Sequence, residues 1–335
     1  MYQGIDKDGH YLVDMIYAPA YTKLCMAALD MDIFSQLQEP KTASKLAEQM
    51  DWHTENTGYF LDALVGILLL TKEDGCYKNT AISNKYLVPD KERFMGDFMQ
   101  MYVGLSGFEQ TDFAALVKDG PNAVNEEQPQ NISFAEQIHV MRKGQSGERS
   151  YEAVTFLKTL PEFKNAKRLL DLGCGTGMLG IGAAQANPDL QVILFDTPQM
   201  KEGIIDSITQ SGLAERVTAV GGDYLNDDIG ESYDIIMAFA TLNFARPVLV
   251  SVMQKLHQAL NPNGVLIIAS DGISADGTLP ADMVAGWLPY TMKGMDFRMP
   301  SGVTPNAALA AGFKHVHTTT ALSCSGNTEI HLIRK

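Results

Sequence analysis

A glycine-rich loop between an apolar run and a helical stretch constrains the fold of this 335-residue chain more than any other feature. Residues 168–172, Arg-Leu-Leu-Asp-Leu, are typical of a short buried strand, and glycines follow at positions 173, 175 and 177. A helical apolar pattern begins at once and continues over residues 178–186. Glycines in such a turn let backbone N–H groups at a helix N-terminus approach a polar or anionic ligand closely. The segment therefore predicts a ligand-binding α/β domain.

The pattern of the second half of the chain supports this fold class. Short β-rich runs at 168–172, 191–195, 217–220, 233–238 and 265–269 alternate with helical segments, which predicts a parallel sheet flanked by helices. The last two runs, 313–321 and 328–333, are separated by a loop too short for a helix. We therefore expect these two strands to pair antiparallel.

The first half of the chain has a different pattern. Apolar spacing predicts helices over residues 21–37, 43–50 and 55–69, followed by a hairpin of residues 68–71 and 76–78. Three helices and a hairpin predict a winged helix. Residues 118–131 are rich in polar residues and helix breakers. We expect a winged-helix domain over residues 1–100, a helical connector over 101–160 and the α/β domain over 161–335.

Charge and composition exclude several classes of partner. The formal charge of −14 would repel phosphate backbones and anionic lipid. No lysine or arginine occurs in residues 46–71, which include the helix that would read DNA in a winged helix. The N-terminus carries no secretory pattern, and no apolar stretch approaches the ~20 residues of a membrane span. We therefore expect a cytoplasmic protein that binds neither nucleic acid nor membrane. We also expect no metal site, since the four cysteines are widely scattered.

The glycines by themselves fit two cofactors. Gly175, Gly177 and Gly180 satisfy the dinucleotide pattern G-x-G-x-x-G, and Asp196 follows at about the spacing of a ribose-binding acid. A nicotinamide cofactor is therefore one interpretation. The carboxylate of Asp171, directly before the glycines, favours S-adenosylmethionine (SAM) instead, because it would attract the methionine ammonium and repel a pyrophosphate.

Two further features favour SAM. Gly222-Asp223-Tyr224 follows the third strand, where a carboxylate can accept from the adenine amino group and an aromatic ring can pack on the base. The expected antiparallel pair at the end of the chain is not normally seen in nucleotide-dependent dehydrogenases. The sequence therefore predicts SAM as the cofactor and S-adenosylhomocysteine as the product.

Taken together, these segments resemble a known series of motifs. Residues 171–177, 195–198, 222–224, 260–264 and 310–313 are similar to those of class I SAM-dependent methyltransferases. More narrowly, the chain resembles the small-molecule O-methyltransferases of the caffeic acid and acetylserotonin type, which join a winged-helix dimerisation domain to a Rossmann-like domain. The resemblance implies a homodimer and a small-molecule acceptor. It also implies a cofactor-binding set: Asp171, Gly173, Gly175, Gly177, Asp196, Thr197, Asp223, Tyr224 and Phe239.

The chain departs from this family at the expected general base. Members with phenolic acceptors carry a His-Asp pair nine and ten residues after the acid that opens the fourth strand, and counting from Asp234 these positions hold Asn243 and Phe244. Asparagine cannot take up a proton at ordinary pH. Either Asn243 only positions an acceptor that needs no base, such as sulfur, nitrogen or an ionised oxygen, or another residue is the base. His139 is the first candidate for such a base.

The resemblance also implies an acceptor pocket, to which the 101–160 connector would contribute. Its expected wall comprises Met141, Tyr151, Trp287, Met292, Met295 and Arg298. One of Arg142, Arg149, Arg246 and Arg298 could pair with a substrate carboxylate. The predicted function is methyl transfer to a small organic acceptor. The alternatives are an NAD(P)-dependent oxidoreductase and a non-catalytic SAM-binding winged-helix regulator.

Overall fold

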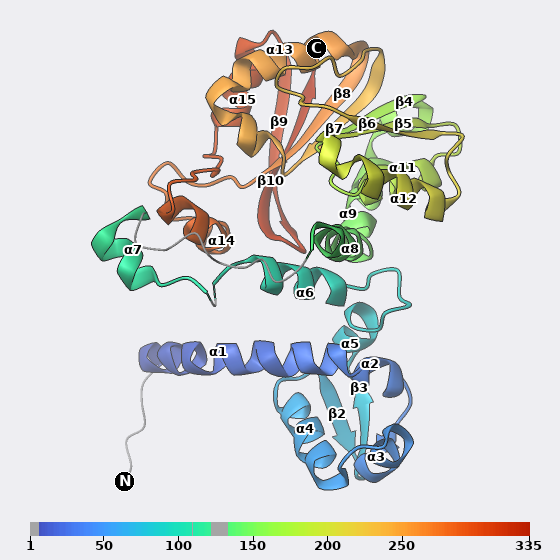
Figure 1. Cartoon of the computed structure of the whole chain (residues 1–335), viewed down its shortest axis with the longest axis vertical. Helices are drawn as coiled ribbons and strands as arrows, with labels where there is room; N and C mark the ends of the chain where they lie inside the picture. The colour runs from blue at the N-terminus through green and yellow to red at the C-terminus, as the bar shows by residue number, and fades with distance from the viewer. Residues whose placement is uncertain (1–6, 109, 122–132) are drawn as a thin grey trace. The chain divides into compact units, whose positions relative to one another are not determined.

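The structure is a computed structural model that describes residues 7–108, 110–121 and 133–335 (Figure 1). The chain divides into two compact units, Met1–Gln100 and Met101–Lys335. The boundary falls within helix α6 (Gly96–Leu105), and the predicted connector over residues 101–160 belongs to the second unit.

The first unit is mostly helical with a small antiparallel sheet, in the strand order β1-β3-β2. Its elements are α1 (Lys7–Asp30), α2 (Ile33–Gln36), β1 (Lys41–Thr42), α3 (Ala43–Met50), α4 (Thr54–Gly66), β2 (Leu70–Glu73), β3 (Cys76–Asn79) and α5 (Ala81–Tyr86). Leu46 of α3 and Leu61 of α4 are fully buried in the apolar core of this unit, together with Leu70 and Tyr77 of its sheet. The predicted winged-helix arrangement is therefore present.

Two predicted bounds in this unit were wrong. The single helix expected over residues 21–37 is broken between α1 and α2, where Asp32 adopts a left-handed conformation with φ of 52°. The helix expected over 55–69 ends at Gly66, because Leu68 has a φ of 63°. The hairpin turn is tighter than expected, since Asp74 and Gly75 alone connect β2 to β3, both with positive φ as a two-residue type I′ turn requires.

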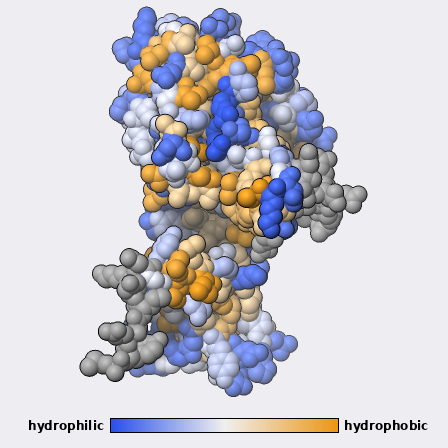
Figure 2. Space-filling view, turned by 90° about the vertical axis from the view of Figure 1, so that its left-hand side faces the viewer, coloured by the Kyte–Doolittle hydropathy of each residue, from blue (hydrophilic) through white to orange (hydrophobic). Residues whose placement is uncertain are grey.

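The long helix α1 exposes a row of large apolar side chains. Tyr11, Leu12, Met15, Ile16 and Tyr17 are each more than half exposed. Figure 2 shows hydrophobic surface (orange) interspersed with polar surface on the face turned to the viewer. Several exposed apolar side chains gathered on one helix are a feature of protein interaction sites.

The second unit is built on a seven-stranded sheet in the order β6-β5-β4-β7-β8-β10-β9 (Figure 1). Its strands are β4 (Arg168–Leu172), β5 (Gln191–Asp196), β6 (Val217–Gly221), β7 (Tyr233–Phe239), β8 (Leu260–Ser270), β9 (His315–Ser323) and β10 (Gly326–Arg334). Strands β4 to β8 pair in parallel, and β10 is antiparallel to both β8 and β9. The predicted sheet is confirmed, although the last loop contains only Cys324 and Ser325.

Helices cover both faces of this sheet because successive strand residues point to opposite sides. The helical elements are α7 (Phe113–Asp119), α8 (Phe134–Gln145), α9 (Glu148–Thr159), α10 (Pro161–Asn165), α11 (Met178–Ala186), η2 (Pro198–Met200), α12 (Lys201–Ser211), η3 (Leu242–Val248), α13 (Leu249–Ala259), α14 (Ala281–Met292) and α15 (Val303–Ala310). Leu169 of β4 packs with α9, α11 and α12, whereas Leu170 packs with α13 and α15. Part of the predicted 118–131 connection lies outside the described residues. Within the described ranges, no helix is long and apolar enough to cross a membrane.

Candidate cofactor and acceptor site

The loop from β4 to α11 can be built only from glycine at its key positions. Gly173, Gly175 and Gly177 have φ of 66°, 60° and 82°, a region that L side chains rarely adopt. A methyl group on Gly173 would come 2.0 Å from Oγ1 of Thr241. One on Gly175 would come 2.4 Å from Nε2 of Gln145. The glycines thus keep the backbone in close contact with its neighbours at the N-terminus of α11.

Two side chains from distant segments hold this loop. The Gly175 N–H donates to Oδ2 of Asp196 at 2.7 Å, and the Thr197 N–H donates to Oδ1 of the same carboxylate at 2.7 Å. The N–H and hydroxyl of Thr176 donate to Oε1 of Gln145 at 3.0 and 2.6 Å. Burial raises the pKa of Asp196. Gln145 was not anticipated, because nothing local in the sequence links the end of α8 to a loop 31 residues later.

A buried carboxylate lies behind the loop. Asp171 is only 3% exposed, and its Oδ2 accepts the Gly180 N–H at 2.9 Å. Burial, reinforced by the charge of Asp196, raises the pKa of Asp171 to about 7. A cation brought next to this carboxylate would favour its ionised form. The structure therefore has an acid that suits the ammonium of a methionine moiety, next to a glycine loop whose backbone a ligand can approach closely.

The segment after β6 is folded on itself. The exposed Asp223 accepts from the Leu225 N–H at 2.9 Å and from Nδ2 of Asn226 at 2.6 Å. Tyr224 donates its hydroxyl hydrogen to the carbonyl of Thr241 at 2.8 Å, which joins the loops after β6 and β7. These two predicted adenine contacts thus lie at the same edge of the sheet as the glycine loop, since all parallel strands end there.

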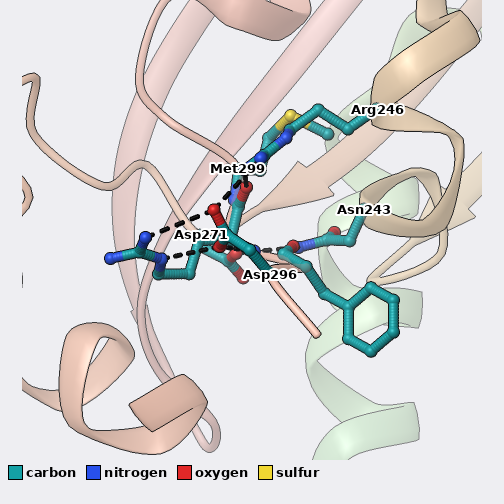
Figure 3. A network of polar contacts seen from close by, with 7 residues as sticks. Asn243, Arg246, Asp271, Asp296 and Met299 are labelled. Atoms are coloured by element: carbon teal, nitrogen blue, oxygen red, sulfur yellow. Dashed lines mark hydrogen bonds and ion pairs between the residues drawn. The ribbon is translucent and has the colours of Figure 1, made fainter. Parts of the chain in front are cut away.

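The loops after β7 and β8 meet at a buried asparagine. Asn243 in η3 is 3% exposed, and its Nδ2 donates to Oδ2 of Asp271 at 2.7 Å and to the carbonyl of Phe297 at 2.8 Å (Figure 3). The Met299 N–H donates to the same Oδ2 at 3.0 Å, and the side chain of Trp287 also hydrogen-bonds to Asp271. Burial raises the pKa of Asp271.

Sequence reasoning overlooked Asp271, although a signal was present. Asp171, Asp196, Asp223 and Asp271 each lie at or just after the carboxyl end of a parallel strand. The first three were recognised from the motifs around them, and the fourth follows the apolar strand β8 in the same way. Ligands of open α/β sheets bind at this edge.

Comparisons with known proteins match both units of the chain. Residues 130–288 match the model of a family described as an O-methyltransferase domain, and residues 13–89 match an O-methyltransferase dimerisation domain. The acetylserotonin O-methyltransferase of Rattus norvegicus is 24% identical over 92% of this chain and 74% of that protein. The N,N-dimethyltransferase OxyT of Streptomyces rimosus is 22% identical over 77% of this chain and 76% of its own length.

A solved structure shows the same fold. Human N-acetylserotonin methyltransferase, determined in complex with SAM, superposes with a TM-score of 0.75 at 17% identity and covers 100% of this chain and 99% of that one. This chain belongs to the family of SAM-dependent O-methyltransferases. It is therefore a SAM-dependent methyltransferase, and the oxidoreductase and regulator alternatives are set aside.

In this methyltransferase two of the arginines considered as substrate contacts, Arg246 and Arg298, are paired within the chain. Asp296 contacts Nη2 of Arg246 at 3.1 Å and Nε of Arg298 at 2.7 Å (Figure 3). Arg246 also donates from Nη1 to the carbonyl of Arg298 at 2.6 Å. The arginines, Arg298 above all, hold the pKa of Asp296 down at about 2. A substrate carboxylate would therefore compete with Asp296 for Arg298.

The other residues predicted to contact the acceptor differ in burial and in location. Trp287 of α14 lies near Phe297, with ring centroids 6.1 Å apart, and so packs beside the residues that hold the Asn243 amide. Met141 packs on the core beside the sheet, and Met295 is exposed. Tyr151 of α9 and Met292 at the end of α14 are half-buried. His139 is on the exposed side of α8. Its role as a base remains a prediction.

Proposed function

We propose that this methyltransferase moves a methyl group from SAM to a small organic acceptor without a general base at position 243. Bound SAM supplies an electrophilic methyl group on a sulfonium. The observation that carries the proposal is the amide of Asn243, held by Asp271 and Phe297 at the position where phenol-methylating relatives are expected to have histidine. An amide can orient an acceptor but cannot remove its proton.

The cofactor is proposed to lie along the carboxyl edge of β4, β5 and β6. Asp171 would neutralise the methionine ammonium, while Gly173, Gly175 and Gly177 let the backbone approach the methionine part. Asp196, with Thr197, would accept from the ribose hydroxyls in place of its present loop amides. Asp223, Tyr224 and Phe239 would surround the adenine side.

The acceptor is proposed to bind beside this edge, over β7 and β8. Asn243 and Trp287 lie there with Phe297, whose ring is 4.8 Å from that of Phe244. An aromatic or apolar acceptor suits such a wall. Relatives whose names record both oxygen and nitrogen methylation leave the acceptor atom open.

We further propose that the enzyme is a homodimer formed through its N-terminal unit. A dimerisation-domain match over residues 13–89 and the exposed apolar row on α1 support this assignment. Light scattering would test it, and a monomer at micromolar concentration would contradict it.

The function is tested by two measurements on the full chain. Calorimetry should show binding of SAM and of S-adenosylhomocysteine, and a metabolite library incubated with methyl-labelled SAM should yield a labelled small molecule. Failure to bind either nucleoside would refute the proposed cofactor site. Binding without label in any small molecule would refute the proposed acceptor class.

A further inference from the structure

We propose that Asp271 orients the amide of Asn243 so that Oδ1 faces the acceptor, and that the nucleophile is therefore an amine bearing an N–H group. This inference rests on the proposed function and deepens it by naming the acceptor class. It assigns Asp271 as a positioning residue and Asn243 as the residue that touches the acceptor.

The hydrogen bonds of Asn243 determine which way its amide points. The carbonyl of Phe297 can only accept, so the group facing it at 2.8 Å must be the NH2 of Asn243. The second NH2 hydrogen points to Oδ2 of Asp271 at 2.7 Å. Both amide hydrogens are thereby used within the protein. The acceptor cannot be recognised by the nitrogen of this side chain.

The amide oxygen is left for a ligand. Among the described residues, no group donates to Oδ1 of Asn243, and Oδ1 is not one of the fully buried oxygens that lack a partner. It therefore keeps some accessible surface although the residue as a whole is 3% exposed. A polar atom in such a place is satisfied by an incoming O–H or N–H donor.

The charges around Asn243 disfavour an anionic nucleophile. Oδ1, the carboxylate of Asp271 and the carbonyl of Phe297 all carry negative or partial negative charge. The cations of this segment, Arg246 and Arg298, are paired with Asp296. A phenolate or carboxylate placed here would be repelled, whereas a group that becomes positive during the reaction would be stabilised.

An amine is the nucleophile that meets both conditions without a base. Its nitrogen lone pair forms the C–N bond while the methyl C–S bond breaks, and the electron pair of that bond stays on sulfur in S-adenosylhomocysteine. The product is an N-methylammonium whose N–H remains bonded to Oδ1 of Asn243, and water takes the proton afterwards. A neutral hydroxyl would need to lose its proton to a base that Asn243 cannot provide. A thioether has no hydrogen to donate.

The first test compares acceptors matched by scaffold. Full-length enzyme is incubated with methyl-labelled SAM and a library of aromatic compounds in amino and hydroxyl pairs, for example 6-aminoquinoline and 6-hydroxyquinoline. Label is expected in amino members only. Equal or greater label in hydroxyl members would overturn the inference, as would label in neither set by an enzyme that binds SAM. Loss of SAM binding would instead refute the proposed function.

The second test separates positioning from folding. Asp271→Ala is expected to lower kcat for the amine by about tenfold at most, the effect of losing Asn243 itself, while binding of S-adenosylhomocysteine by calorimetry stays unchanged. Asp271→Asn should restore most of the rate, because a carboxamide oxygen can still accept from Nδ2 of Asn243. The matched control is Asp276→Ala, which removes an exposed carboxylate from the same loop and should leave kcat and KM unchanged. Equal rates in wild type and Asp271→Ala would overturn the positioning role.

Asn243→His is a third variant that keeps the inference testable if Asp271→Ala fails to fold. An imidazole at this position would face the carboxylate of Asp271 and could accept a proton. We expect label in hydroxyl members of the library, with a rate that rises with pH as the imidazole loses its proton. Retention of wild-type amine selectivity in this variant would show that position 243 does not choose the nucleophile.

Discussion

The glycine loop makes the most direct quantitative prediction, the effect of Gly173→Ala. Gly173 has a φ of 66°, and an added Cβ would lie 2.0 Å from Oγ1 and 2.5 Å from Cβ of the buried Thr241. Left-handed backbone costs an L residue about 1–2 kcal/mol. Overpacking against a neighbour that cannot move freely adds about 1–3 kcal/mol. We therefore predict a loss of about 2–5 kcal/mol in the free energy of unfolding.

Gly212→Ala is the matched control for this prediction. Gly212 ends α12 with a φ of 69°, but an added Cβ would have no atom within 4 Å. It should lose only the backbone cost of about 1–2 kcal/mol. Urea unfolding of both variants gives the difference in their free energies of unfolding. Calorimetry with S-adenosylhomocysteine should show more than about tenfold weaker binding, or about 1.4 kcal/mol, only for Gly173→Ala, because only there does the added methyl group clash and displace the loop. Equal destabilisation and equal binding in the two variants would refute the steric argument.

Three further predictions concern individual side chains. Asp196→Ala should weaken SAM binding, since it removes the proposed ribose acceptor and releases the amides of Gly175 and Thr197; an unchanged dissociation constant by calorimetry would exclude that role. The pKa of Asp171, raised from 3.8 to about 7, means that the folded state binds its proton more tightly than the unfolded state does, so the free energy of unfolding without cofactor should fall between about pH 4 and 7. Asp171→Asn should flatten that part of the pH curve of urea unfolding, and a slope equal to wild type would contradict the assignment. Asn243→Ala should lower kcat by about tenfold, well short of the 10²–10⁴-fold typical of a lost general base; steady-state kinetics with the identified acceptor would show a larger fall if Asn243 were indispensable.

The sequence predicted the parts of the fold that follow local rules. The glycines at 173, 175 and 177 mark a strand-to-helix loop because positive φ strongly disfavours other residues. The alternation of apolar runs identified all seven strands of the large sheet, and the short last loop predicted their antiparallel ending. The break at Asp32 was missed because apolar spacing continues across it, and one left-handed residue leaves little trace in such a pattern.

The contacts of the proposed cofactor and acceptor site were harder to predict for a different reason. Gln145 reaches a loop 31 residues away, and Asn243 bonds to Asp271 and Phe297 across 28 and 54 residues. Arg298 stays a predicted substrate contact, and only the structure showed that its guanidinium is paired with Asp296. Whether a polar side chain meets a ligand or a neighbour depends on packing, which spacing along the chain does not encode.

The amino-acid sequence by itself determined that this chain has a SAM loop, a sheet with an antiparallel ending and an amide where a basic imidazole was expected. These are properties of residue type and local backbone conformation. Only the tertiary structure decided which atom of that amide is available. The NH2 of Asn243 donates to two groups from the loops after β8 and α14, and its oxygen is therefore the atom that we propose contacts the methyl acceptor.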